Sequence, residues 1–174
     1  MKSTGIFFAG MLLMLSACEQ SSSNQSSASA ADSSNDSLFM VTEGPFAFSI
    51  LLPKDLMISD STLLRFMPST GEMVIQIGEG FRLLVREESA SLQQLLEESA
   101  SPGVFTNQPV EQDDQVVIYQ QFLPTGEAWY YQVAGVVRHE SKAYSVRSDP
   151  MGEFTLFEAR QMAEAIRGIS APDA

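Results

Sequence analysis

Apolar side chains recur at every second position from about residue 38 onward, a pattern typical of strands that bury one face. Before the first helical segment this alternation predicts strands over residues 46–52, 63–67, 73–77 and 81–85. The segments between them carry turn residues, and glycine in particular tolerates the positive φ that tight turns require. We expect the turns at Pro53, at Ser69-Thr70-Gly71 and at Gly78-Glu79-Gly80.

A second group of strands follows, over residues 116–122, 129–138 and 143–147. The segment 129–138 is the longest, and it carries apolar groups on both faces. One face holds Trp129, Tyr131, Val133 and Val137, and the other holds Tyr130, Ala134 and Val136. Because both faces are apolar, we expect this strand to be central in its sheet and covered on both sides.

Two helices are predicted from their capping residues and apolar stripes. Ser91 with Gln94, and Thr155 with Glu158, have the spacing of capping boxes, in which each side chain satisfies a free backbone N–H. Apolar residues at helical spacing follow each box. The stripes are Leu92, Leu95 and Leu96, and then Leu156, Ala159, Met162, Ala163, Ile166 and Ile169.

The predicted order is therefore four strands, a helix, three strands and a helix. Short turns between consecutive strands require antiparallel pairing. We expect an α+β fold, with a twisted antiparallel sheet of about six to seven strands and two amphipathic helices packed on it.

This order, with Phe48-Ser-Ile-Leu-Leu-Pro53 near its start and Tyr144-Ser-Val before the last helix, resembles a known fold over residues 44–170. It is the α/β/α sandwich shared by the photosystem II extrinsic protein PsbP and a eukaryotic Ran-binding import factor. The resemblance implies a binding or assembly module. No functional residue of either family maps onto this chain.

The amino-terminal segment combines a positive charge, an apolar run and a short motif. Lys2 precedes the apolar stretch Ile6–Leu15, and Leu15-Ser16-Ala17-Cys18 follows. The segment resembles the lipobox of bacterial lipoprotein precursors. The resemblance implies cleavage between Ala17 and Cys18, with diacylglycerol on the Cys18 thiol. An uncharged stretch of about 16 residues is short for a membrane-spanning helix, which needs about 20.

The sequence thus predicts a signal peptide over 1–17, a lipidated cysteine and flexible Ser-rich linker over 18–37, and one globular domain over 38–174. The linker has no large apolar side chain, so it cannot offset the entropy of ordering. As a coil it would span roughly 25 Å. The residue after the cysteine is Glu19 and not the Asp that retains lipoproteins at the inner membrane, so the resemblance favours the outer membrane.

Charge and cysteine content exclude several function classes. The chain has 10 Lys and Arg against 22 Asp and Glu, a formal charge of −12. That sign opposes nucleic-acid binding and opposes lying flat on anionic lipid. With Cys18 as the only cysteine, the chain forms no internal disulfide and no cysteine metal site.

Few residues suggest catalysis, and we expect no cofactor and no metal. His139, the only histidine, would have to serve any hydrolase triad, and it falls in a predicted turn. The acidic run of Glu111, Asp113 and Asp114 lacks the ligand spacing of a Ca²⁺ loop and is better explained as a charged hairpin connection. The pairs Glu87-Glu88 and Glu97-Glu98 are consistent with solvated surface.

The candidate binding surface is the aromatic run Trp129, Tyr130 and Tyr131, which either packs in the core or forms a platform for a partner.

Together these patterns favour a non-catalytic binding or assembly module of the cell envelope, attached to the membrane through Cys18 and binding an unknown envelope protein. A hydrolase-like envelope enzyme and a small-ligand carrier are the alternatives. An enzyme would show a deep cleft with converging polar groups, and a carrier a large cavity. A binding module would show an apolar patch or an open sheet edge.

Overall fold

The computed structural model describes residues 36–42, 45–53, 62–100, 104–139 and 142–170. The expected lipobox with Cys18, the linker up to residue 35 and the expected helix stop at Pro102-Gly103 lie outside these residues. The described elements all belong to one compact unit, Ser34–Ala174.

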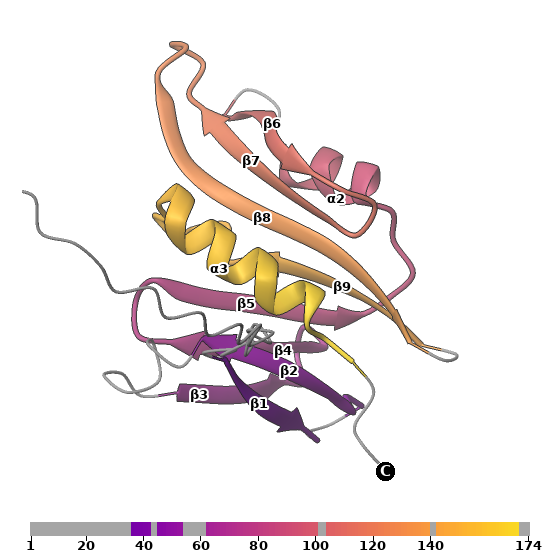
Figure 1. The fold of residues 1–174 in the computed structure, drawn as a ribbon. Coiled ribbons are helices and arrows are strands. Elements are labelled where there is room, and N and C mark those ends of the chain that lie inside the picture. The colour runs from indigo at the N-terminus through magenta and orange to yellow at the C-terminus, as the bar shows by residue number, and fades with distance from the viewer. Residues whose placement is uncertain (1–35, 43–44, 54–61, 101–103, 140–141, 171–174) are drawn as a thin grey trace, which may run out of the picture. The chain divides into compact units, whose positions relative to one another are not determined.

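A seven-stranded antiparallel sheet forms the centre of this unit, with the strand order β3-β4-β5-β9-β8-β7-β6 (Figure 1). The expected α+β class, with a twisted antiparallel sheet and two helices packed on it, is confirmed. All neighbouring strands in this sheet pair antiparallel. Where a short turn joins two consecutive strands, antiparallel pairing is required. The strands are β3 (Thr62–Met67), β4 (Glu72–Ile77), β5 (Phe81–Glu87), β6 (Thr106–Gln112), β7 (Val116–Phe122), β8 (Ala128–His139) and β9 (Lys142–Ser148).

The first expected strand does not join this sheet. It is β2 (Phe48–Pro53), and among the described strands its partner is β1 (Asp36–Val41), with which it forms a separate two-stranded sheet. The sequence pattern did not predict β1, because the first residues of this strand have the polar composition of the linker before it. The strand begins at Asp36, opposite Pro53, so it starts before the expected domain boundary at Leu38.

Strand β6 was also missed. Its sequence Thr-Asn-Gln-Pro-Val-Glu-Gln lacks a regular apolar face, and its register shifts between Pro109 and Glu111. Such features are common in edge strands, where proline and irregular pairing discourage contact with another chain. Pairing with β7 holds this strand in the sheet, because its own sequence has no alternation of apolar and polar residues.

The main hydrophobic core lies between one face of the sheet and a layer made of α3 (Leu156–Arg167) and the β1–β2 sheet. Helix α3 approaches β8 most closely at Gly135. A Cβ atom at that position would lie 2.6 Å from Cγ2 of Ile166 and 3.3 Å from the carbonyl oxygen of Gln115. Only glycine allows the helix and the strand to come this close. After the helix, Ser170 exchanges two backbone hydrogen bonds of 2.9 Å with Ser49 of β2.

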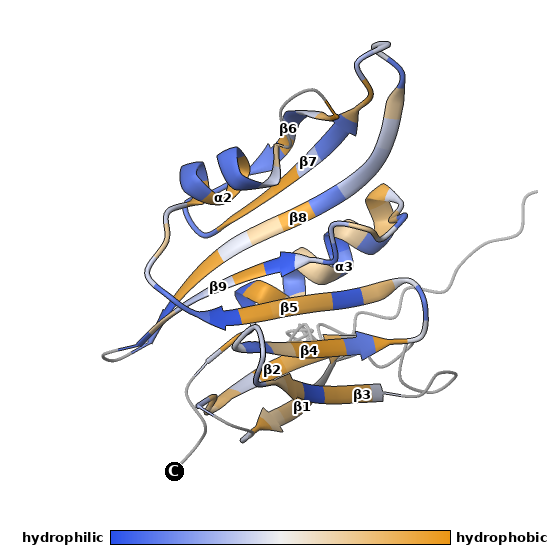
Figure 2. Ribbon diagram, turned by 180° about the vertical axis from the view of Figure 1, so that it is seen from behind, coloured by the Kyte–Doolittle hydropathy of each residue, from blue (hydrophilic) through white to orange (hydrophobic). Residues whose placement is uncertain are grey.

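A smaller core lies on the opposite face, under α2 (Leu92–Ser99). Leu92 and Leu95 of this helix contact Val117 and Tyr119 of β7 and Ala134 of β8. Strand β8 therefore contributes Val133 and Val137 to the main core and Ala134 to the second core, which confirms that it is covered on both sides. In Figure 2, α2 lies in front of the β6–β8 half of the sheet.

Both predicted capping boxes are present. The Ser91 hydroxyl accepts from the Gln94 N–H, and the Thr155 hydroxyl accepts from the Glu158 N–H, with each Gln or Glu side chain returning to the cap backbone. Helix α3 ends at Gly168, as expected.

A chain that starts at Ser34 is expected to fold without residues 1–33, because both hydrophobic cores lie within the compact unit. It should melt in one transition within about 2 °C of a chain that keeps the linker. A chain that starts at Leu38 loses the Asp36 and Ser37 pairs with β2 and should melt earlier. Thermal unfolding followed by circular dichroism checks both expectations, and equal melting of all three chains would contradict a structural role for the first residues of β1.

Candidate functional site: an aromatic groove

An apolar groove lies where β8 begins. It is lined by Phe105 before β6, Trp129 of β8, and Met151 of the loop that joins β9 to α3. A smaller hollow lined by Val104, Phe105, Thr106 and Pro124 adjoins it, and Phe105 belongs to both. We call the two together the aromatic groove.

Trp129 packs edge to face against Tyr130 and at a tilted angle against Phe105. The Trp129 and Tyr130 rings are 4.9 Å apart at 66°, and the Phe105 and Trp129 rings are 6.3 Å apart at 34°. These are the separations at which aromatic pairs attract. The Tyr130 hydroxyl is hydrogen-bonded to the Glu153 carboxylate, and this bond, with burial and the charge of Glu153, raises the pKa of Tyr130.

The loop that carries Met151 is held by hydrogen bonds at several points. The Met151 N–H donates to Asp149 Oδ1 at 3.0 Å, and the Gly152 N–H donates to the Asp149 carbonyl at 2.9 Å. The Gly152 carbonyl accepts from Gln132 Nε2 at 2.8 Å, which ties the loop to β8. At Gly152 a Cβ atom would collide with the ring of Phe154. Met151 is therefore presented on an ordered loop.

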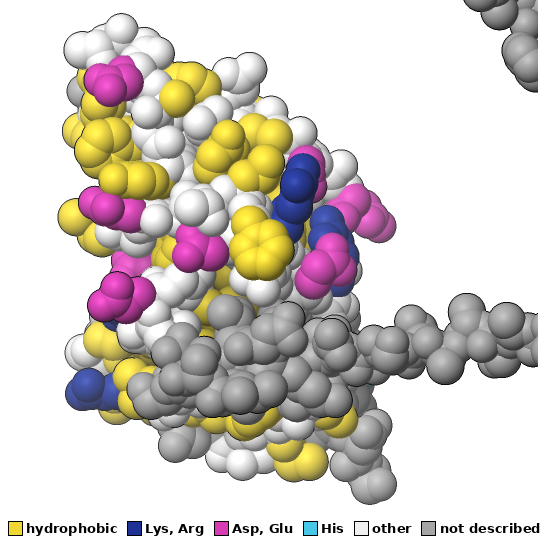
Figure 3. Space-filling model, turned by 60° about the vertical axis from the view of Figure 1, so that its left-hand side comes forward, with side chains coloured by type: hydrophobic (Ala, Val, Ile, Leu, Met, Phe, Trp, Pro, Cys, Tyr) yellow, Lys and Arg dark blue, Asp and Glu magenta, His cyan; other side chains and the backbone are white. Residues whose placement is uncertain are grey.

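The apolar side chains of the groove are open to solvent. Met151 is 86% exposed, Val104 49% and Trp129 41%. Figure 3 views the end of the domain where β8 and α3 begin, and it shows hydrophobic side chains in several groups with acidic side chains between them. A large exposed apolar cluster rimmed by polar residues is typical of an interaction site.

The expected aromatic run divides between surface and core. Trp129 and Tyr130 line or flank the groove, whereas Tyr131 packs against the main core and donates its backbone N–H to the Phe154 carbonyl at 3.0 Å. The platform is thus made of part of the predicted run, with Phe105 and Met151 added from other segments.

The groove is small. The hollow at Trp129 has a volume of about 150 Å³, and the hollow at Val104 about 80 Å³. Pockets that enclose a whole small molecule usually have about 300–1,000 Å³. Each hollow therefore suits one inserted side chain better than a complete ligand.

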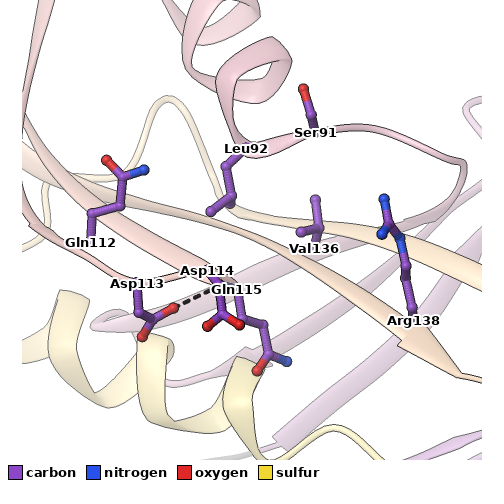
Figure 4. A pocket seen from close by; sticks show the side chains of 8 residues that line it. All are labelled: Ser91, Leu92, Gln112, Asp113, Asp114, Gln115, Val136 and Arg138. Atoms are coloured by element: carbon purple, nitrogen blue, oxygen red, sulfur yellow. Dashed lines mark hydrogen bonds between the residues drawn. The ribbon is translucent and has the colours of Figure 1, made fainter.

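A larger depression of about 540 Å³ lies between the start of α2 and the β6–β7 turn (Figure 4). Its polar groups do not converge. Figure 4 shows Arg138 on the far side of Val136 from Asp113 and Asp114, and the Asp113 carboxylate bonded to the Gln115 backbone. The depression is also widely open to solvent, unlike a catalytic cleft that excludes water.

The acidic run beside this depression fastens the β6–β7 turn to α3. Asp113 Oδ2 accepts from Arg167 at 2.7 and 2.9 Å, and Glu111 accepts from Arg160 Nε at 2.8 Å. The other oxygen of Asp113 accepts from the backbone N–H groups of Gln115 and Val116. This arrangement explains the acidic run as a structural connection, and the described residues include no group of three His, Cys, Asp or Glu side chains that could hold a metal ion.

The charge state of this connection depends on pH. Burial alone would raise the pKa of Asp113, but the hydrogen bonds from Val116, Gln115 and Arg167 outweigh it and lower that pKa. The hydrogen bond from Arg160 lowers the pKa of Glu111. Because both folded-state pKa values lie below the unfolded ones, the stabilisation is present at neutral pH and is lost as pH falls through the folded pKa values.

Asp113→Asn is expected to lower the free energy of unfolding by about 1 kcal/mol at pH 7, since the ion pair is partly exposed to solvent. The difference from the unmodified chain should shrink below about pH 4, where the unfolded carboxyl is itself protonated. Asp114→Asn removes the same charge one residue away and should have little effect. Urea unfolding at several pH values measures the free energy of unfolding of each chain. A difference between Asp113→Asn and the unmodified chain that does not depend on pH would contradict the ion-pair explanation.

The other candidate residues lie apart from the groove. His139 ends β8 opposite Lys142 of β9. Glu87 pairs with Lys142 at 3.2 Å, Glu88 accepts from the Ser145 hydroxyl, and Glu97 accepts from Gln93. Three of the four paired carboxylates, Glu87, Glu88 and Glu97, are thus engaged by neighbouring side chains.

Phe105 and Met151 were not predicted from the sequence as groove residues. A signal was present for each, because both are large apolar residues next to turn-forming sequences, Pro102-Gly103 and Asp149-Pro150. Strand and helix patterns do not explain an apolar side chain in a turn, so such a residue is a candidate for surface contact.

No protein-family model, curated protein or solved structure matches the chain. Neither helix of the described residues is long and apolar enough to span a bilayer.

Proposed function

We propose that this protein is a lipid-anchored, non-catalytic binding module of the bacterial cell envelope. Cys18 carries the lipid, residues 19–35 form the tether, and the folded domain binds a protein partner. Glu19 in place of the inner-membrane retention residue favours the outer membrane.

The observation that carries the binding role is the aromatic groove. Trp129, Phe105 and Met151 present an ordered, exposed apolar cluster with hollows sized for single side chains. Tryptophan and tyrosine in such positions supply much of the binding energy at protein interfaces, and methionine adapts to irregular partner surfaces. The open, non-convergent polar depression beside α2 supports binding over hydrolysis. The openness of that depression and the small size of the groove hollows support binding over ligand transport.

Removal of the groove side chains should abolish partner capture. In a pull-down from envelope extracts with the chain from Ser34, we expect Trp129→Ala combined with Met151→Ser to weaken recovery of a specific protein about 30-fold or more. The partner bound by the unmodified chain should also shift the emission of Trp129, the only tryptophan, to shorter wavelength.

A matched control exists on β1, where Leu38 and Met40 are 54% and 55% exposed. Leu38→Ser with Met40→Ser removes a similar exposed apolar area away from the groove and should leave capture unchanged. If both double variants are folded and lose partner recovery equally, capture depends on nonspecific hydrophobic adsorption, and the groove is not the binding site.

A further inference from the structure

One half of the central sheet has a face with no described helix over it. This is the side of β3, β4, β5 and β9 that points away from the main core, and Figure 2 shows it beside the half that α2 covers. We call it the open sheet face. Directly opposed residues in neighbouring strands share a face, so the register gives its composition.

The register places three rows on the open sheet face. They are Met67–Glu72–Arg86–Ser145, Arg65–Val74–Leu84–Arg147 and Leu63–Gln76–Arg82. In the middle row two arginines flank an apolar pair. The face therefore mixes cationic and apolar side chains.

The open sheet face concentrates arginine side chains, although the net charge of the whole chain is −12. The side chains of Arg82, Arg86 and Arg147 are 40%, 37% and 35% exposed, and Arg65 is exposed. The other Arg and Lys residues in the described part of the chain are Arg138, Lys142, Arg160 and Arg167, so half of the described cations lie on this one face.

Neighbouring carboxylates hold most of these guanidinium groups in place without neutralising them all. Glu72 accepts from both Arg86 at 2.9 Å and Arg147 at 3.1 Å, and Arg82 pairs with Asp149 at 3.2 Å. Arg86 also approaches Glu88 at 3.6 Å. Arg65 forms no ion pair with another described residue, and the Nε atoms of Arg82 and Arg86 have no hydrogen-bond acceptor among those residues.

The composition of the open sheet face is that of a protein interface. Its cations are all arginine, which binds carboxylates through two parallel hydrogen bonds and keeps little hydration water. Arginine and methionine are enriched in protein interfaces, and lysine is depleted. Leu63 is 46% exposed, and Met67 and Leu84 are half-buried, so apolar contact area lies between the charges.

We propose that the open sheet face docks an acidic protein surface on which carboxylate side chains alternate with apolar ones. Carboxylates of the partner would pair with Arg65 and share the exposed edges of Arg82, Arg86 and Arg147, while apolar side chains would cover Leu63 and Leu84. A bilayer of anionic lipid fits less well, because an extended negative plane is repelled by the acidic remainder of the domain. The side chains of this surface are not the ones that line the aromatic groove.

The test uses the chain from Ser34, whose binding here does not depend on the lipid anchor. Fluorescence anisotropy measures its affinity for a labelled peptide of alternating Leu and Glu, with a Leu–Lys peptide as the control probe. We expect the Glu peptide alone to bind, with an affinity that falls as salt rises. Arg65→Gln with Arg147→Gln, which leaves Arg86 paired with Glu72, should weaken binding roughly tenfold.

Arg160→Gln with Arg167→Gln removes the same charge from α3 and should change the affinity by less than about twofold, with thermal melting to verify that both variants are folded. Equal weakening in the two double variants would overturn the proposal, as would equal binding of the two peptides.

Binding of the same chain to vesicles of phosphatidylglycerol is measured as the last part of the experiment. Tighter binding to these vesicles than to the Glu peptide, lost with Arg65 and Arg147, would assign the face to lipid and overturn the protein partner.

Discussion

A chain with Cys18→Ser is expected to accumulate as the uncleaved precursor and to lose its lipid entirely. The thiol of Cys18 is the group that a diacylglycerol chain would be attached to, and a serine hydroxyl is a far weaker nucleophile at neutral pH. Without two or more acyl chains, stable membrane attachment fails, because a single chain anchors only marginally. Intact-mass measurement and membrane fractionation follow both effects, and the expected change is complete.

Ser16→Ala is the matched control, since it keeps a small residue before the cleavage position. This variant should be processed and fractionate with membranes like the unmodified chain. Normal maturation of the Cys18→Ser chain, or its continued presence in washed membranes, would contradict the lipid anchor.

Gly135→Val is expected to destabilise the folded domain by about 3 kcal/mol, since overpacking of a tight core displaces backbone. Helix α3 and strand β8 meet at this glycine, where a Cβ would lie 2.6 Å from Ile166 and 3.3 Å from the carbonyl oxygen of Gln115 in the β6–β7 turn. The melting temperature should fall by roughly 10 °C.

Ala128→Val provides the comparison, because it adds methyl groups at an exposed position of the same strand. Its effect should stay within about 0.5 kcal/mol. If Gly135→Val melted like the unmodified chain, the close contact of α3 with β8 would be wrong, and with it the layer arrangement around the main core.

Elements with strong local signals were predictable from the sequence. The double-sided apolar pattern of residues 129–138 identified the central strand, and the two Ser/Thr caps located both helices. Strands β1 and β6 escaped because most of their stability comes from pairing. In β6, Pro109 and a polar sequence hide an edge strand that its neighbour specifies. In β1, polar residues next to the Ser-rich linker hide the first positions of the strand.

The candidate site was predictable only in part. Trp129 and Tyr130 stood out as aromatics, but Phe105 and Met151 join them from loops that are distant in sequence. The spacing of apolar residues within one segment does not predict such a long-range contact, because the contact depends on the order of the strands in the sheet and on the path of the β9–α3 loop.

The open sheet face was hidden for a related reason. The total charge of −12 argued against anionic partners, yet it says nothing about how charge is distributed. The register of β3, β4, β5 and β9 brings Arg65, Arg86 and Arg147 to one side. This concentration of arginines in an acidic chain thus becomes visible only after the strands are paired.

The most direct measurement is photo-crosslinking in living cells, with a photoactivatable phenylalanine analogue in place of Met151 in the full chain. A matched position is Met40 on β1, which pairs with Ser49 of β2, whereas Met151 lies in the loop before α3. We expect one discrete crosslinked protein in the membrane fraction from position 151 and none from position 40, with the product lost on Cys18→Ser. The same products from both positions, or a crosslink that persists without the anchor, would contradict a tethered module that binds through its aromatic groove.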